Sequence, residues 1–151
     1  MSEKIIIDDL DGLRQRDGQH LFSSEPFEIS KERIQGFCNS IGNDEWIHWD
    51  EERLAKSPLG TIIMPAFMAP ALMSWAYFSK VEFSNIDGLF QGTDKIRLLK
   101  PVKAGEKLVQ HWRIDRVEER NKGIAVYYDV SWEVPGHDGL AGVGTFIVRY
   151  W

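Results

Sequence analysis

The sequence has a single cysteine, no cluster of basic residues and no long apolar run, and each absence excludes a class of protein. With one cysteine, Cys38, the chain cannot form an internal disulfide framework or a metal site built from several thiolates. Its formal net charge of -5 argues against nucleic-acid binding, which usually requires a basic face. Charges and prolines interrupt every apolar run well before the roughly 18 residues that a membrane span requires. We therefore expect no nucleic-acid partner and no membrane partner.

Several recognisable motifs are also missing. The segment from Met1 to Asp11 lacks the basic start and the longer apolar stretch of a signal peptide. No phosphate-binding loop, dinucleotide fingerprint or nucleophile elbow is present, and no His/Asp/Glu spacing suggests a metal site. The remaining composition is that of an ordinary globular protein. We therefore expect a cytoplasmic protein without cofactor or metal, folded as one domain over residues 1–151.

Helical periodicity first appears after an irregular start. Residues 1–29 carry turn signals and no sustained period. Ser30 then suits a helix N-cap, apolar residues follow at helical spacing as far as Ile41, and Gly42 is a plausible stop. The sequence thus predicts a helix between Ser30 and Gly42.

A second helix is expected after a loop. Residues 43–60 mix acids, aromatics, proline and glycine, which predicts a loop with one short helical turn at residues 50–55. Residues 61–78 are apolar nearly all round, and a helix of that kind is buried on every side. The pattern predicts such a helix over about residues 66–79, with Pro70 kinking or restarting it.

After Gly92 the period changes to that of strands. Residues 124–134 alternate between apolar and more polar side chains, as a half-buried strand does. Hairpin turns are expected at residues 121–123 and 135–139. The expected strands cover residues 96–99, 107–119, 123–134 and 140–151. The predicted fold class is α+β, with one long buried helix wrapped by a run of antiparallel strands.

The densest group of chemically useful side chains lies in the expected loop, at residues 41–50. His48 is flanked there by Trp46, Ile47 and Trp49, and histidine is the usual general acid/base of enzymes. The alternative is a structural histidine bonded to a backbone carbonyl. The other candidates are weaker: solvated histidines, a buried thiol, and acids that face solvent or begin a helix. These are His20, His111, His137, Cys38, Asp44-Glu45 and Asp50-Glu51-Glu52.

Three segments resemble the signature of the MaoC-like dehydratases, in particular their NodN-like branch. That branch reads GDHQWIHVD, then SPFGTTIAHG, then GLNKVRF with PV and a glycine after it. The corresponding letters here are GNDEWIHWD (residues 42–50), SPLGTII (residues 57–63) and GTDKIR (residues 92–97) with PV at residues 101–102. The similarity runs from about Leu10 to the C-terminus.

The resemblance implies a hotdog fold, a long central helix wrapped by a curved antiparallel sheet, in a homodimer or larger homo-oligomer. It also implies a lyase that hydrates trans-2-enoyl thioesters or dehydrates (R)-3-hydroxyacyl thioesters carried by coenzyme A or an acyl carrier protein. By position, the family's catalytic aspartate and histidine are Asn43 and His48. The backbone N–H that receives the thioester oxygen is that of Ala66. We assign Ala66, Trp46 and Ile63 to substrate binding.

The chain departs from the family pattern at two of these positions. Asn43 replaces the aspartate, and an amide cannot take a proton; Pro65-Ala66 replaces a histidine-glycine pair. An enzyme with His48 as its single proton shuttle and Asn43 holding an oxygen fits these residues, for dehydration or for cyclisation of a polyketide-like chain. A catalytically silent module that binds acyl thioesters, and a thioesterase, are the alternatives.

Overall fold

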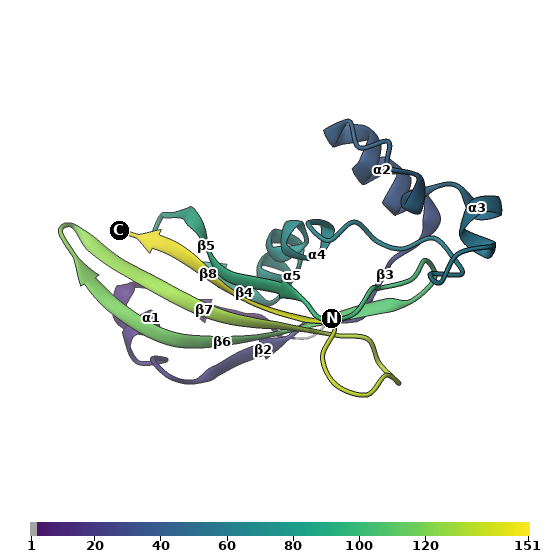
Figure 1. Cartoon of the computed structure of the whole chain (residues 1–151). Coiled ribbons are helices and arrows are strands. Elements are labelled where there is room, and N and C mark those ends of the chain that lie inside the picture. Colours follow the sequence, from purple (N-terminus) through teal and green to yellow (C-terminus); the bar gives the residue numbers. More distant parts are fainter. Residues whose placement is uncertain (1–2) are drawn as a thin grey trace.

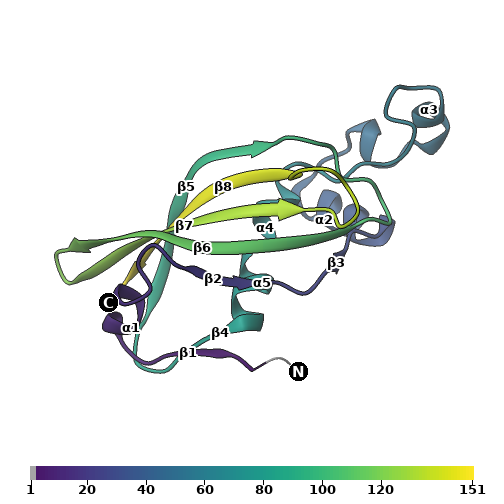
Figure 2. The ribbon, with the colours of Figure 1, turned by 90° about the horizontal axis from the view of Figure 1, so that it is seen from below.

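The computed structural model describes residues 3–151 and is organised around one twisted antiparallel sheet. Figure 2 shows the strand order β2-β6-β7-β8-β5, with the short β3 paired to β6 as well. The strands are β2 (His20–Ser23), β3 (Phe27–Glu28), β5 (Gly88–Leu98), β6 (Lys107–Arg120), β7 (Gly123–Glu133) and β8 (Gly142–Tyr150). The four long strands confirm the expected antiparallel run, although β5 begins at Gly88, before the predicted change of period.

The alternating pattern of β7 places its apolar side chains in the core. Val126, Tyr128, Val130 and Trp132 are each at most 2% exposed. The β6–β7 hairpin closes where the sequence predicts a turn, with positive φ at Lys122 and Gly123. Gly123 is required there, because a Cβ atom would lie 2.0 Å from the carbonyl oxygen of Tyr150.

The N-terminal region is more regular than the sequence suggests. It contains β1 (Ile5–Ile7), which pairs in parallel with β4 (Val81–Phe83), and α1 (Leu10–Arg14). The expectation of irregular structure over residues 1–29 is therefore wrong. These elements are too short to show a period, and their pairing partners lie far along the chain.

Two helices and a helical turn lie beyond one end of the sheet (Figure 1). They are α2 (Lys31–Ile41), the 3-10 helix η1 (Trp46–His48) and α3 (Glu51–Ala55). Ser30 caps α2 through a hydrogen bond from the Arg33 N–H, and Gly42 ends it in the left-handed conformation. The predicted cap, stop and short helical turn are thus confirmed.

The apolar helix packs against the concave face of the sheet (Figure 1), close to its expected position over residues 66–79. It consists of α4 (Met68–Ala71) and α5 (Met73–Lys80), separated at Leu72. Pro70 lies inside α4 and has no N–H to donate, so the break follows the predicted restart. Residues 62–64 are extended instead of helical, because the Met64 N–H donates to the Val102 carbonyl at 2.7 Å.

One side of this helical region is open to solvent, so the expectation of burial on every side is wrong for the single chain. Ala76 and Tyr77 face the core. Phe67, Trp75 and Phe78 are 74%, 38% and 60% exposed. The edge strand β5 adds Phe90, which is also exposed. The chain therefore carries an uncovered apolar surface along α4, α5 and β5.

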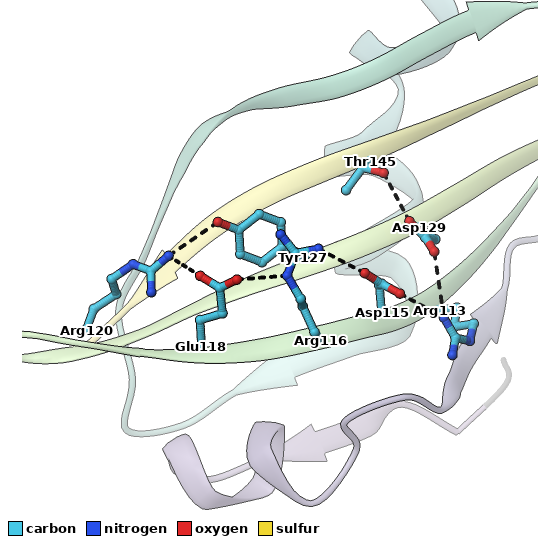
Figure 3. Close-up of polar contacts among 8 residues, drawn as sticks. All are labelled: Arg113, Asp115, Arg116, Glu118, Arg120, Tyr127, Asp129 and Thr145. Carbon is cyan, nitrogen blue, oxygen red and sulfur yellow. Dashed lines mark hydrogen bonds and ion pairs between the residues drawn. The ribbon is translucent and has the colours of Figure 1, made fainter.

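The face of the sheet opposite the helices is polar. Figure 3 shows a row of ion pairs along β6 and β7, in which Arg116 Nε lies 2.8 Å from Glu118 Oε1. Asp129 accepts a hydrogen bond from Thr145 at 3.0 Å and lies 3.6 Å from Arg113. This row shows that the outer face meets solvent and that the core lies on the helix side.

Three buried tyrosines form a closed cluster at the centre of that core. The hydroxyl of Tyr128 lies 2.8 Å from that of Tyr77 and 2.8 Å from that of Tyr150. The Tyr77 and Tyr150 hydroxyls are 3.5 Å apart, so each phenol has a partner. Burial raises the pKa of Tyr150 to about 12 and holds those of Tyr77 and Tyr128 well above the usual value. The cluster is therefore uncharged at neutral pH.

We expect this cluster to set the alkaline limit of stability. Above about pH 10 the unfolded chain loses phenolic protons that the folded chain keeps. The free energy of unfolding should therefore fall from about pH 10 up to the folded-state pKa values, and level off only beyond them. In Tyr150→Phe, which removes one such phenol, the fall should be shallower. Urea unfolding from neutral pH to about pH 12 measures both slopes; equal slopes would contradict this account.

Candidate active site

The loop between α2 and α3 is shaped by hydrogen bonds from its own side chains. The Asn43 Oδ1 atom accepts the backbone N–H of Glu45 at 3.0 Å, which forms a tight turn directly after α2. The Trp49 Nε1–H donates to the carbonyl of Asp44 at 2.9 Å. The turn leads into η1, whose last residue is His48. The side chains of Asn43 and Trp49 thus fix the backbone that presents His48.

His48 is held in one orientation by a neighbouring segment. Its side chain is 5% exposed, and its Nδ1 atom lies 2.7 Å from the carbonyl oxygen of Ile63. A carbonyl only accepts, so Nδ1 carries the proton and the neutral ring has its lone pair on Nε2. A second bond, from the Ile63 N–H to the Ile47 carbonyl at 3.3 Å, joins the same segments. Nε2 is therefore the ring atom available to accept a proton.

A cavity of about 240 Å³ opens beside His48. The Ala66 N–H, at its wall, donates to no acceptor within residues 3–151 and is available to a ligand oxygen. The wall is mostly apolar, with two charged side chains. It consists of Glu45, Ile47, His48, Ile63, Met64, Ala66, Leu98, Lys100, Pro101 and Val102. A proton acceptor and a free backbone donor in one small cavity suit chemistry at a carbonyl compound.

The structure brings together three of the five residues assigned from the sequence. His48, Ile63 and Ala66 line the cavity, whereas Asn43 and Trp46 do not. The carboxamide oxygen of Asn43 is used in the turn, and the ring of Trp46 lies 3.9 Å from the guanidinium carbon of Arg53. Asn43, which the resemblance pairs with His48, is therefore not part of the wall of this cavity.

Glu45 is the functional group that the sequence interpretation missed. Its Oε2 atom lies 3.7 Å from His48 Nε2, and it lines the same cavity. Glu45 and His48 are three residues apart, and side chains at that spacing eclipse one another in a 3-10 helix. The sequence favours solvated or helix-start acids at residues 44 and 45 and does not distinguish between the two. A prediction of a 3-10 helix at residues 46–48 would have placed the side chain of Glu45, and not that of Asp44, next to His48.

The remaining candidates lie outside this cavity. Burial raises the pKa of the Cys38 thiol, as expected of a core residue. Within residues 3–151, no three His, Cys, Asp or Glu side chains are placed to share a metal ion. In the same part of the chain, every helix is too short or too polar to cross a bilayer. A cavity of about 480 Å³ next to the tyrosine cluster has no histidine among its lining residues.

Sequence comparisons with known proteins agree with one another. The sequence model of a family described as "FAS1-like, dehydratase domain region" matches residues 17–141. The 3-hydroxyacyl-thioester dehydratase Z of Mycobacterium tuberculosis is 29% identical over 135 residues, which cover 88% of this chain and 89% of that protein. Nodulation protein N of Rhizobium leguminosarum bv. viciae is 30% identical over 137 residues, covering 87% of this chain and 84% of the relative.

A solved structure agrees with these relatives in fold. The MaoC-like dehydratase from Rhodospirillum rubrum superimposes with a TM-score of 0.71 over 88% of this chain and 90% of that one. The two sequences are 16% identical, so the similarity concerns the fold alone.

The turn before η1 provides a test of the role of Asn43. Asn43→Ala should lower the free energy of unfolding by about 1 kcal/mol, because the Glu45 N–H loses its acceptor. Asn43→Asp keeps an oxygen in the same place and should be close to wild type in stability. Urea denaturation of the two variants measures the difference. If Asn43→Asp destabilises the protein as much as Asn43→Ala, the side chain does not act as a turn acceptor.

Proposed function

Because the chain belongs to the FAS1-like dehydratase-region family and has the MaoC-like hotdog fold, we propose that it interconverts 3-hydroxyacyl and 2-enoyl thioesters. The lyase-type activity expected from the sequence is supported by the relative named as a 3-hydroxyacyl-thioester dehydratase. The observation that carries the proposal is that His48, with its lone pair on Nε2, and Ala66, whose N–H makes no hydrogen bond within residues 3–151, line one cavity. Acyl chains bound to coenzyme A or to an acyl carrier protein are the proposed substrates.

The two groups have complementary tasks in the proposed reaction. Removal of water requires loss of a proton from C2, next to the thioester carbonyl, and loss of a hydroxyl from C3. His48 Nε2 accepts the C2 proton, and the negative charge that develops on the carbonyl oxygen is stabilised by the Ala66 N–H. Ile63 holds the ring through its carbonyl, so it acts as a positioning residue as well as part of the wall.

Binding without turnover is the second candidate, and the amide at Asn43 favours it. The two functions are separated by assaying a panel of straight-chain enoyl-CoA thioesters. Hydration removes the absorbance of the conjugated thioester without releasing free thiol, whereas a thioesterase releases the thiol. A binding module does neither and only retains the ligand. The same assay therefore also tests the thioesterase alternative.

We propose further that the chain forms a homodimer through the uncovered apolar surface along α4, α5 and β5. β5 is the edge strand of the sheet, so its outer backbone groups are available for pairing. Phe90 on this strand and Phe78 on α5 are exposed large apolar side chains. A contiguous apolar surface of this kind is typical of a subunit interface.

His48→Asn tests catalysis apart from structure. The Asn Nδ2–H can replace Nδ1–H as the donor to Ile63, but the side chain has no basic nitrogen. We expect a loss of about 10²–10⁴ in kcat with little change in melting temperature. His48→Ala should lose both turnover and stability, because it leaves a buried carbonyl unpaired. Wild-type turnover in His48→Asn would show that the histidine is structural.

Light scattering tests the dimer. At micromolar concentration the wild-type protein should have about twice the 17.4 kDa mass of the chain. Phe78→Lys places a charge on the apolar surface and should shift the mass toward that of one chain. Ile6→Lys is the matched control, since Ile6 is 50% exposed but lies on β1. A monomeric wild-type protein, or equal effects of the two substitutions, would overturn the proposed interface.

A further inference from the structure

We propose that Glu45 is a second catalytic residue of this site and exchanges a proton with the substrate hydroxyl. The inference rests on the proposed function, because it assigns a role within the same cavity. Adding or removing water involves two proton transfers, one at C2 and one at the oxygen on C3. His48 Nε2 accounts for the first, and the second needs another acid/base group within reach.

Glu45 is the carboxylate placed to supply that group. Its Oε2 lies 3.7 Å from His48 Nε2, too far for a direct hydrogen bond but close enough for one oxygen atom to contact both. The Glu45 side chain is 59% exposed, and its carboxylate makes no hydrogen bond within residues 3–151. It is therefore free to bond to a substrate hydroxyl or a water.

The turn before η1 selects Glu45 over the neighbouring acid. Asn43 fixes the Glu45 N–H, and Trp49 fixes the carbonyl of Asp44. Glu45 is then the N-cap residue of η1, one 3-10 turn before His48, and Asp44 is not part of the cavity wall. Asn43 thus acts as a positioning residue for the catalytic carboxylate.

Other charged groups near the His48 ring do not offer a second carboxylate to this cavity. Lys100 is the other charged residue of the wall, and its Nζ contacts the carbonyl of Asp138. A separate depression touches His48 from the α2 side and includes Lys31, Glu32 and Glu51. Lys31 Nζ lies 2.6 Å from Glu51 Oε1, and Ala66 is not part of that depression.

The reaction balances if Glu45 and His48 share one proton. In dehydration, neutral His48 accepts the C2 proton, and the C2–H electron pair forms the enolate held by Ala66. The enolate pair then forms the C2–C3 double bond, the C3–O bond breaks, and protonated Glu45 gives its proton to the departing oxygen, which leaves as water. The pair ends as carboxylate and imidazolium, and the proton returns from His48 to Glu45. Hydration follows the same steps in reverse.

The test compares Glu45→Gln with three controls in the hydration of crotonyl-CoA. We expect Glu45→Gln to lower kcat by about 10²–10⁴ with an unchanged fold and melting temperature, and Glu45→Asp to recover part of the loss. Asp44→Asn removes the adjacent charge and should keep wild-type turnover. Asn43→Asp combined with Glu45→Gln keeps the net charge but places the carboxylate in the turn, so it should remain as slow as Glu45→Gln.

The pH profile distinguishes catalysis from a structural role. With a shared proton, wild-type kcat should fall on both the acidic and the alkaline side, and Glu45→Gln should lose one of the two limbs. Wild-type kcat in Glu45→Gln, together with a slow His48→Asn, would overturn the role of Glu45 and leave the proposed function standing. A wild-type protein that turns over none of the enoyl thioesters would overturn both.

Discussion

The hydrogen bond from His48 Nδ1–H to the Ile63 carbonyl is the interaction on which the site depends. It joins two irregular segments, η1 and residues 62–64, that share no helix or strand. It fixes the tautomer of the ring, leaves the lone pair on Nε2 and orients that atom toward the cavity. Since Ala66 lies only three residues after Ile63, the same bond also sets the distance between the proton acceptor and the free N–H. Glu45 then needs only one 3-10 turn to reach Nε2.

The same hydrogen bond explains why the helix does not extend over the whole apolar run of residues 61–78. Residues 62–64 are extended because they pair with the His48 segment on one side and with residues 102–104 on the other. An apolar run has no polar face to reveal its period, so a buried extended segment cannot be told from a buried helix by pattern alone. The strands β6, β7 and β8 were predictable because one of their faces is polar. The caps Ser30 and Gly42 were predictable because their roles depend on local backbone geometry.

The residues of the site that lie within a recognisable sequence segment could be predicted. His48 could be found from the aromatic loop and the resemblance, and Ile63 and Ala66 from the second motif segment. The direction of a side chain in a loop depends on hydrogen bonds that a motif does not encode. Asn43 occupies the position expected of a catalytic residue, yet its oxygen is used by the Glu45 N–H. A carboxylate two residues later faces the histidine instead.

The site is built largely apart from the core, and this separation makes its chemistry testable. The core consists of the concave face of the sheet, the tyrosine cluster and the inner side of α5, whereas Glu45 and Ala66 are exposed residues at the end of the sheet. Changing either one removes no core packing. His48 is the exception, because its buried ring satisfies a carbonyl as well as carrying the lone pair. A substitution of His48 must therefore keep a donor to the Ile63 carbonyl while removing Nε2, so that it changes the chemistry without changing the stability. Glu45 makes no such structural bond, so its carboxylate can be replaced directly.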